Sequence, residues 1–83
     1  MRQFTEIDTK GLLCPLPVLK VKKAIKALAP GELISILATD PASTRDIPAF
    51  CRSAGHSLER SQEADGVYSF LIRKAGGELR QAS

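Results

Sequence analysis

The apolar run LISILAT, at residues 33–39, constrains the fold more than any other feature of this sequence. The run is apolar at both alternations, which is typical of an interior strand with one face under a helix and the other face shielded. A chain of 83 residues has room for one core only. We therefore expect a strand over Leu33–Thr39 at the centre of a single small domain.

The segment before this strand has the pattern of an amphipathic helix. Apolar residues recur at three- and four-residue steps, at Val18, Val21, Ile25 and Leu28. Four lysines take the opposite side: Lys20, Lys22, Lys23 and Lys26. The sequence Ala29-Pro30-Gly31 is expected to end the helix, because proline and glycine cannot readily continue it.

Turn signals divide the rest of the chain into further elements. Phe4–Asp8 is a short strand candidate, and a second helix begins with Ser43 or Thr44 as its cap and ends before Gly55. A hairpin around Asp65-Gly66 joins two more strands, Leu58–Glu63 and Val67–Lys74. The buried stripe of the second helix is expected at Ile47, Phe50, Cys51 and Ala54.

This order predicts a two-layer α/β sandwich, β-α-β-α-β-β. Right-handed crossovers place both helices on one face of a mixed four-stranded sheet, while the strand order stays open. We expect one domain over residues 1–75 and a flexible tail over 76–83.

Composition excludes several classes of protein. Two cysteines are too few for a disulfide framework, and no apolar stretch approaches the roughly 20 residues of a membrane span. The polar start lacks the apolar region of a signal peptide, so we expect a cytoplasmic protein with free thiols and no membrane partner. The net charge of +3 comes from residues 15–29, which hold four lysines and no acid. An ordinary solvated face and a docking face for an acidic partner are equally open interpretations.

A cysteine stands at the head of the basic helix. After the turn at Gly11, Cys14 falls at the predicted N-cap, with Pro15 first and Pro17 third in the helix. Because Pro17 has no amide hydrogen, the sulfur is expected to face the Leu16 N–H and the positive end of the helix dipole. That position and the nearby lysines predict a lowered pKa for Cys14. The alternative is that the prolines merely stiffen a helix start.

These residues lie in a longer pattern that closely resembles the TusA/SirA-like sulfur carrier family, whose signature is Cys-Pro-x-Pro at the start of the first helix. The matching segments are Asp8-x-x-Gly11-Leu12-x-Cys14-Pro15-x-Pro17, Pro30-Gly31-Glu32, Asp40-Pro41-Ala42, Thr44-Arg45-Asp46-Ile47-Pro48, Gly55-His56 and Leu71-Ile72-Arg73-Lys74. The resemblance implies a β-α-β-α-β-β fold and a sulfurtransferase that needs no cofactor. It also implies that Cys14 takes sulfur as a persulfide from a cysteine desulfurase and hands it to a downstream sulfur-relay protein. In the best-known members the relay ends in 2-thiouridine in tRNA.

Other residues have supporting or structural interpretations. Asp40 follows the central strand and is expected either to flank Cys14 or to cap the next turn. Cys51 is expected in the core and His56 in a structural role, and the ligand spacing for a metal is missing. A partner face is predicted on the exposed side of the first helix, at Leu16, Leu19, Lys22, Lys23 and Lys26.

A small regulatory or RNA-binding module that uses the basic helix is the alternative function. The chain has four aromatic residues, which is few for nucleic-acid binding, so we expect no stable contact with nucleic acid. The free carrier is expected to be a monomer.

Overall fold

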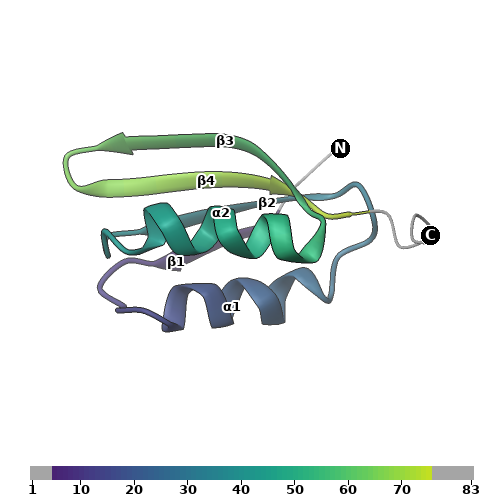
Figure 1. Cartoon of the computed structure of the whole chain (residues 1–83), viewed down its shortest axis with the longest axis horizontal. Helices are drawn as coiled ribbons and strands as arrows, with labels where there is room; N and C mark the ends of the chain where they lie inside the picture. The colour runs from purple at the N-terminus through teal and green to yellow at the C-terminus, as the bar shows by residue number, and fades with distance from the viewer. Residues whose placement is uncertain (1–4, 76–83) are drawn as a thin grey trace.

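The computed structural model describes residues 5–75 and contains the six expected elements in the expected order (Figure 1). The predicted tail at 76–83 lies outside the described residues, as does Phe4. The bounds are β1 Thr5–Thr9, α1 Leu16–Ile25, β2 Leu33–Ala38, α2 Ser43–Ala54, β3 Ser57–Ala64 and β4 Val67–Arg73.

The four strands form one mixed sheet in the order β1-β2-β4-β3. β1 pairs parallel to β2, with Thr9 opposite Ala38 at the end of the ladder. β4 pairs antiparallel to both β2 and β3. The prediction of an interior strand is therefore confirmed, because β2 has a hydrogen-bonded neighbour on each side.

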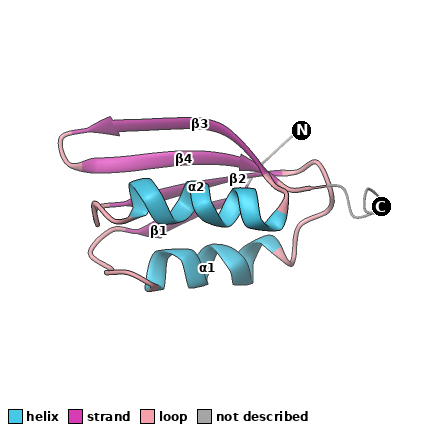
Figure 2. Ribbon diagram, viewed as in Figure 1, coloured by secondary structure: helices cyan, strands magenta, loops and turns pink. Residues whose placement is uncertain are grey.

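Both helices cover the same face of the sheet, as predicted (Figure 2). Their apolar sides meet the strands in one core, made of Val21, Ile25, Ile34, Ile36, Ile47, Cys51, Phe70 and Ile72. The sheet contributes alternate residues to this core, as a two-residue side-chain period requires.

The other face of the sheet carries no helix. Leu33, Ser35 and Leu37 of β2 are half-buried there, so this face of the strand is shielded in part. A shallow cavity of about 220 Å³ lies on this face between Ser35 and Arg60.

Element boundaries differ from the predictions by a few residues. α1 ends at Ile25 rather than near Ala29, and Leu28 packs against the core from the turns that follow. α2 starts after Ala42 without a side-chain cap, because the Thr44 hydroxyl donates to the Pro41 carbonyl instead. Ala54, expected in the buried stripe, is exposed at the last helical position.

Two turns have the conformations predicted from their glycines: the end of α2 at Gly55 and the hairpin turn at Asp65-Gly66. Gly55 ends α2 in the left-handed conformation at φ 83°. Asp65 and Gly66 both have positive φ between β3 and β4, as the tightest class of hairpin requires. Across residues 5–75, no helix has the length and apolar character needed to cross a membrane.

The core assignment predicts the effect of truncating Ile36, which is fully buried at the centre of β2. Ile36→Ala should lower the free energy of unfolding by about 2–5 kcal/mol, because it removes buried methyl groups and leaves a cavity. Leu19→Ala, at a half-exposed site on α1, is the matched control and should change it by less than about 1 kcal/mol. Urea denaturation of both variants checks this, and equal losses would contradict the assignment.

Candidate active site

Two loops meet at one edge of the sheet, where the parallel strands β1 and β2 both end (Figure 1). The loop after β1 carries Cys14, and the loop after β2 carries Asp40. Hydrogen bonds connect them: the Gly11 amide donates to Thr39 Oγ1 at 2.9 Å, and the Cys14 amide donates to Asp40 Oδ2 at 2.6 Å. The main chain at Cys14 is therefore held by a residue 26 positions away in the sequence.

Asp40 performs both roles that the sequence left open. While Oδ2 accepts from Cys14, Oδ1 accepts from the Ala42 amide at 3.2 Å and so closes the turn into α2. Asp8 supports the first loop in a similar way, accepting from the Lys10 amide at 2.9 Å. Both carboxylates accept hydrogen bonds from main-chain amides in the loops, which have no helical carbonyl as a partner.

The start of α1 differs from the prediction by one residue. Pro15 is the N-cap, Leu16 is the first helical residue, and Pro17 is the second. The Leu16 amide donates to the Leu13 carbonyl at 2.9 Å, so it does not bind the Cys14 sulfur. The predicted contact between sulfur and helix amide is therefore wrong. The Cys14–Pro15 peptide bond is cis.

The Cys14 thiol is exposed and turns toward the other helix. Its Sγ donates to Oδ2 of Asp46, in the first turn of α2, at 2.9 Å. This hydrogen bond, with smaller effects from partial burial and from the charges of Asp46 and Asp40, raises the pKa of Cys14, and Arg45 lowers it slightly. The predicted lowering of this pKa is therefore wrong, because the Asp46 carboxylate contacts the sulfur and Asp40 adds a second negative charge. Lys20, the first lysine of α1, lies about 6 Å further along the helix axis than Leu16, and so further from the end of the helix where Cys14 stands.

Sequence reasoning missed Asp46 as a site residue. The available signal was topological: consecutive helices on one face, each following a parallel strand, begin at the same edge of the sheet. Asp46 lies in the first turn of its helix, as Cys14 lies just before the other. Their contact joins positions 32 residues apart, which no local pattern shows.

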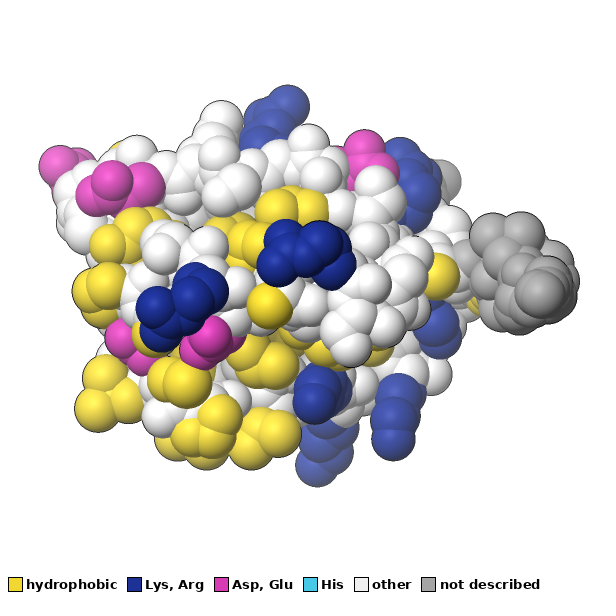
Figure 3. Space-filling view, in the orientation of Figure 1, with side chains coloured by type: hydrophobic (Ala, Val, Ile, Leu, Met, Phe, Trp, Pro, Cys, Tyr) yellow, Lys and Arg dark blue, Asp and Glu magenta, His cyan; other side chains and the backbone are white. Residues whose placement is uncertain are grey.

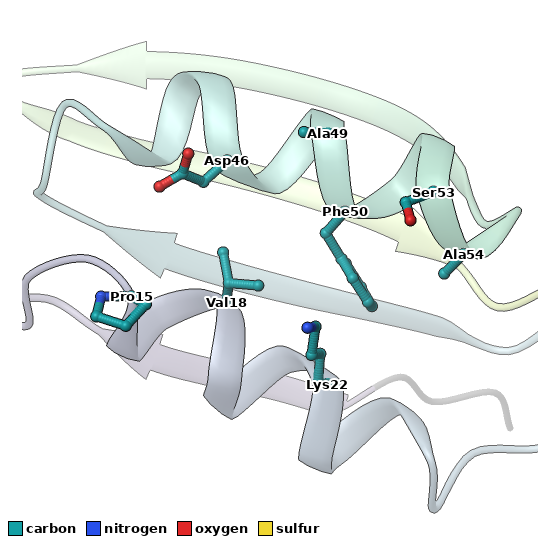
Figure 4. Close-up of a pocket in the computed structure, with 8 residues that line it drawn as sticks. All are labelled: Pro15, Val18, Lys22, Asp46, Ala49, Phe50, Ser53 and Ala54. Carbon is teal, nitrogen blue, oxygen red and sulfur yellow. The ribbon is translucent and has the colours of Figure 1, made fainter.

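A groove runs between α1 and α2 from the thiol end (Figure 4). Its volume is about 460 Å³, and Pro15 and Val18 line one side, with Asp46 and Phe50 on the other. Lys22 also lines it, with its ammonium 5.9 Å from the centre of the Phe50 ring. Lys22 therefore faces α2, whereas the sequence placed it with Leu16 and Leu19 on the outer side.

Three leucines lie exposed around the start of α1. The exposed fractions are 69% for Leu13, 46% for Leu16 and 49% for Leu19, and Leu13 was not among the predicted residues. Lys20, Lys23 and Lys26 are exposed further along the helix. The space-filling view shows hydrophobic side chains gathered near the start of α1 and basic ones near its end (Figure 3).

The remaining candidates, Cys51 and His56, are held by packing and by a main-chain hydrogen bond. Cys51 is buried in the core, as predicted, and burial raises its pKa. His56 Nδ1 accepts from the Ala75 amide at 2.8 Å, and burial together with Lys74 lowers the pKa of His56. Within residues 5–75, no three His, Cys, Asp or Glu side chains gather as metal ligands would.

The two hydrogen bonds of Asp40 predict a stability effect at the site. Asp40→Ala should lower the free energy of unfolding by about 1–3 kcal/mol, because two amide donors lose their acceptor. Asp40→Asn keeps one acceptor oxygen and should lose less. Urea denaturation with amide hydrogen exchange at Cys14 measures both variants, and unchanged exchange in Asp40→Ala would contradict this role.

Comparison with known proteins shows which family this chain resembles. The family described as Sulfurtransferase TusA matches residues 5–74. The sulfur carrier protein TusA of Allochromatium vinosum is 43% identical over 70 residues, which cover 84% of this chain and 92% of that protein. The sulfur carrier protein TusA of Pseudomonas aeruginosa is 47% identical over 68 residues, covering 82% and 86%.

A solved structure shares the fold. The crystal structure of a SirA-like protein from Desulfitobacterium hafniense superposes with a TM-score of 0.78 at 27% identity, covering 87% of this chain and 99% of that one. The family match spans all six elements, including Cys14 and both carboxylates that contact it. This chain therefore belongs to the TusA family of sulfur carriers, and its general role is to carry sulfur in a relay.

Proposed function

We propose that Cys14 accepts sulfane sulfur as a persulfide from a cysteine desulfurase and passes it to an acceptor protein of a sulfur relay. The observation that carries this proposal is the exposed thiol at the joined ends of β1 and β2, in a member of a sulfur carrier family. Thiol chemistry with a sulfane sulfur needs one accessible nucleophile and no bound cofactor.

The proposed transfer is an exchange at sulfur. The Cys14 thiolate attacks the terminal sulfur of the donor's cysteine persulfide, and a bond forms between Cys14 Sγ and that sulfur. The bond to the donor's cysteine sulfur breaks, and the donor leaves as a thiolate that takes up a proton. One sulfur and no net electrons change hands, so the step requires no external oxidant.

The surroundings of Cys14 suit a carrier rather than a disulfide catalyst. Pro17 occupies the place where the second cysteine of a Cys-x-x-Cys motif would stand. The chain's other cysteine, Cys51, is buried in the core. A persulfide on Cys14 therefore has no neighbouring thiol to convert it into a disulfide.

For the destination of the sulfur we propose 2-thiouridine in tRNA, on the strength of the family resemblance. Two free cysteines match a reducing compartment, and we place the carrier in the cytoplasm. Between partners we expect it to act as a monomer.

Mass spectrometry of intact protein tests the sulfur step. After incubation with a cysteine desulfurase and cysteine, the wild type should gain the mass of one sulfur, and a thiol reductant should remove it. Cys14→Ser should gain none, whereas Cys51→Ala should still be loaded, because only Cys14 is exposed. Loading of Cys14→Ser would refute the assignment. Salt-dependent RNA binding independent of Cys14 would favour a binding module instead.

For the donor's docking site we propose the exposed face of α1. Leu16 and Leu19 provide apolar contact next to Cys14, and Lys23 and Lys26 place positive charge beside them. Lys22 is not part of this face, because its ammonium lies over the Phe50 ring in the groove between the helices. Such a surface suits a partner with acidic residues around its persulfide cysteine.

Charge reversal tests the docking face. Lys23→Glu combined with Lys26→Glu should slow sulfur uptake at low ionic strength by about tenfold or more, and much less at high salt, because exposed charges mainly set encounter rates. Both sites leave the contact of Lys22 with Phe50 intact. Arg52→Glu with Arg60→Glu makes the same charge change elsewhere and should leave uptake nearly unchanged. Wild-type uptake by the lysine variant in low salt would exclude this docking face.

A further inference from the structure

The contact between Cys14 and Asp46 has a consequence for the reactivity of the carrier. Cys14 Sγ and Asp46 Oδ2 are 2.9 Å apart, at hydrogen-bond distance for a thiol donor and a carboxylate acceptor. This contact stabilises the protonated sulfur, because a thiolate has no hydrogen to donate and would face a second anion at the same distance. The carboxylate of Asp40, bound to the Cys14 amide, adds negative charge on the same side.

Among residues 5–75, one positive group opposes these carboxylates at Cys14. Arg45 Nε lies 3.7 Å from Oδ1 of Asp46, the oxygen that the thiol does not use. Its side chain is 81% exposed, against 28% for Asp46, so water screens its charge far more. The charges that act on Cys14 are thus Asp46, Asp40 and Arg45, and the negative ones dominate.

Asp46 could act as a base that removes the thiol proton, or as an acceptor that keeps the thiol protonated. The relative basicity of a carboxylate and a thiolate decides between these two roles. As a base it would take the thiol proton, but carboxylates are in general weaker bases than thiolates by about 4–5 pKa units. Transfer to a carboxylate would then be unfavourable by about 10⁴-fold or more. Loss of the proton to solvent avoids this cost, because no carboxylate has to be protonated at neutral pH. The free thiolate is therefore the accessible nucleophile, and Asp46 opposes its formation.

We propose that Asp46 restrains Cys14 by holding the sulfur as the protonated thiol in the free carrier, and that Arg45 acts in the opposite direction. This inference deepens the proposed function, since it concerns the same sulfur. Its consequence is a carrier that reacts slowly with passing electrophiles and oxidants while it is not bound to a partner. Asp46 is a positioning residue here, because it acts on the substrate through Cys14.

Iodoacetamide alkylation as a function of pH tests the restraint. In Asp46→Asn, which keeps the side-chain size and removes the charge, the midpoint of the alkylation profile should move to lower pH. A lower midpoint raises the thiolate fraction at pH 7, so the alkylation rate there should rise by about twofold or more, even after the lower nucleophilicity of a less basic thiolate is allowed for. Arg45→Gln should move the midpoint to higher pH and slow alkylation.

Opposite shifts at adjacent positions distinguish charge from folding effects, since a merely loosened site would move both variants alike. Glu63→Gln, on exposed β3, loses the same charge without contacting Cys14 and should leave the midpoint unchanged. Peptide masses assign alkylation to Cys14 rather than to buried Cys51. If Asp46→Asn weakens α2, the exposed Arg45 site still allows the test.

An unchanged or raised midpoint in folded Asp46→Asn, or a lowered one in Arg45→Gln, would overturn the proposal. The readout uses no sulfur donor, so its failure is separate from failure of persulfide loading. If the wild type takes up no sulfur while the two variants show the expected shifts in alkylation midpoint, the proposed function is refuted and the restraint by Asp46 is supported.

Discussion

The parallel pairing of β1 with β2 is the interaction on which the site depends. Because both strands run the same way, the chain leaves them at one edge, where Thr9 lies opposite Ala38. The helices that follow must both begin there, and the loop of Cys14 meets Asp40 across main-chain hydrogen bonds. The core beneath the helices, centred on Ile36, keeps this edge in place without taking part in the chemistry.

This arrangement separates charge along the molecule. The carboxylates of Asp40 and Asp46 lie at Cys14, while the lysines of α1 follow further along the helix. Exposed leucines lie between the two regions. In our proposals separate groups serve two needs of a sulfur carrier: Asp46 holds the free thiol protonated in solution, and the basic helix attracts the partner protein.

Fold and site differ in how far they could be predicted. The six elements, the hairpin at Asp65-Gly66 and the position of Cys51 follow from periodicity and turn residues, which act locally. The cap of α1 was placed one residue too early, since the choice between Cys14 and Pro15 depends on which carbonyl the Leu19 amide reaches. Strand order was not predictable, because both βα units allow several neighbours for β4.

The sequence by itself determined the family and the two-layer architecture, since each is encoded in residues close together along the chain. It also indicated Cys14 as the candidate reactive residue. Only the tertiary structure decided the ionisation of Cys14. A helix dipole and nearby lysines predicted a lowered pKa, whereas Asp46, 32 residues away, raises it. The physical reason is distance: Coulomb and hydrogen-bond energies depend on separation in space, so one carboxylate in contact with the sulfur outweighs several lysines that are near it only in sequence.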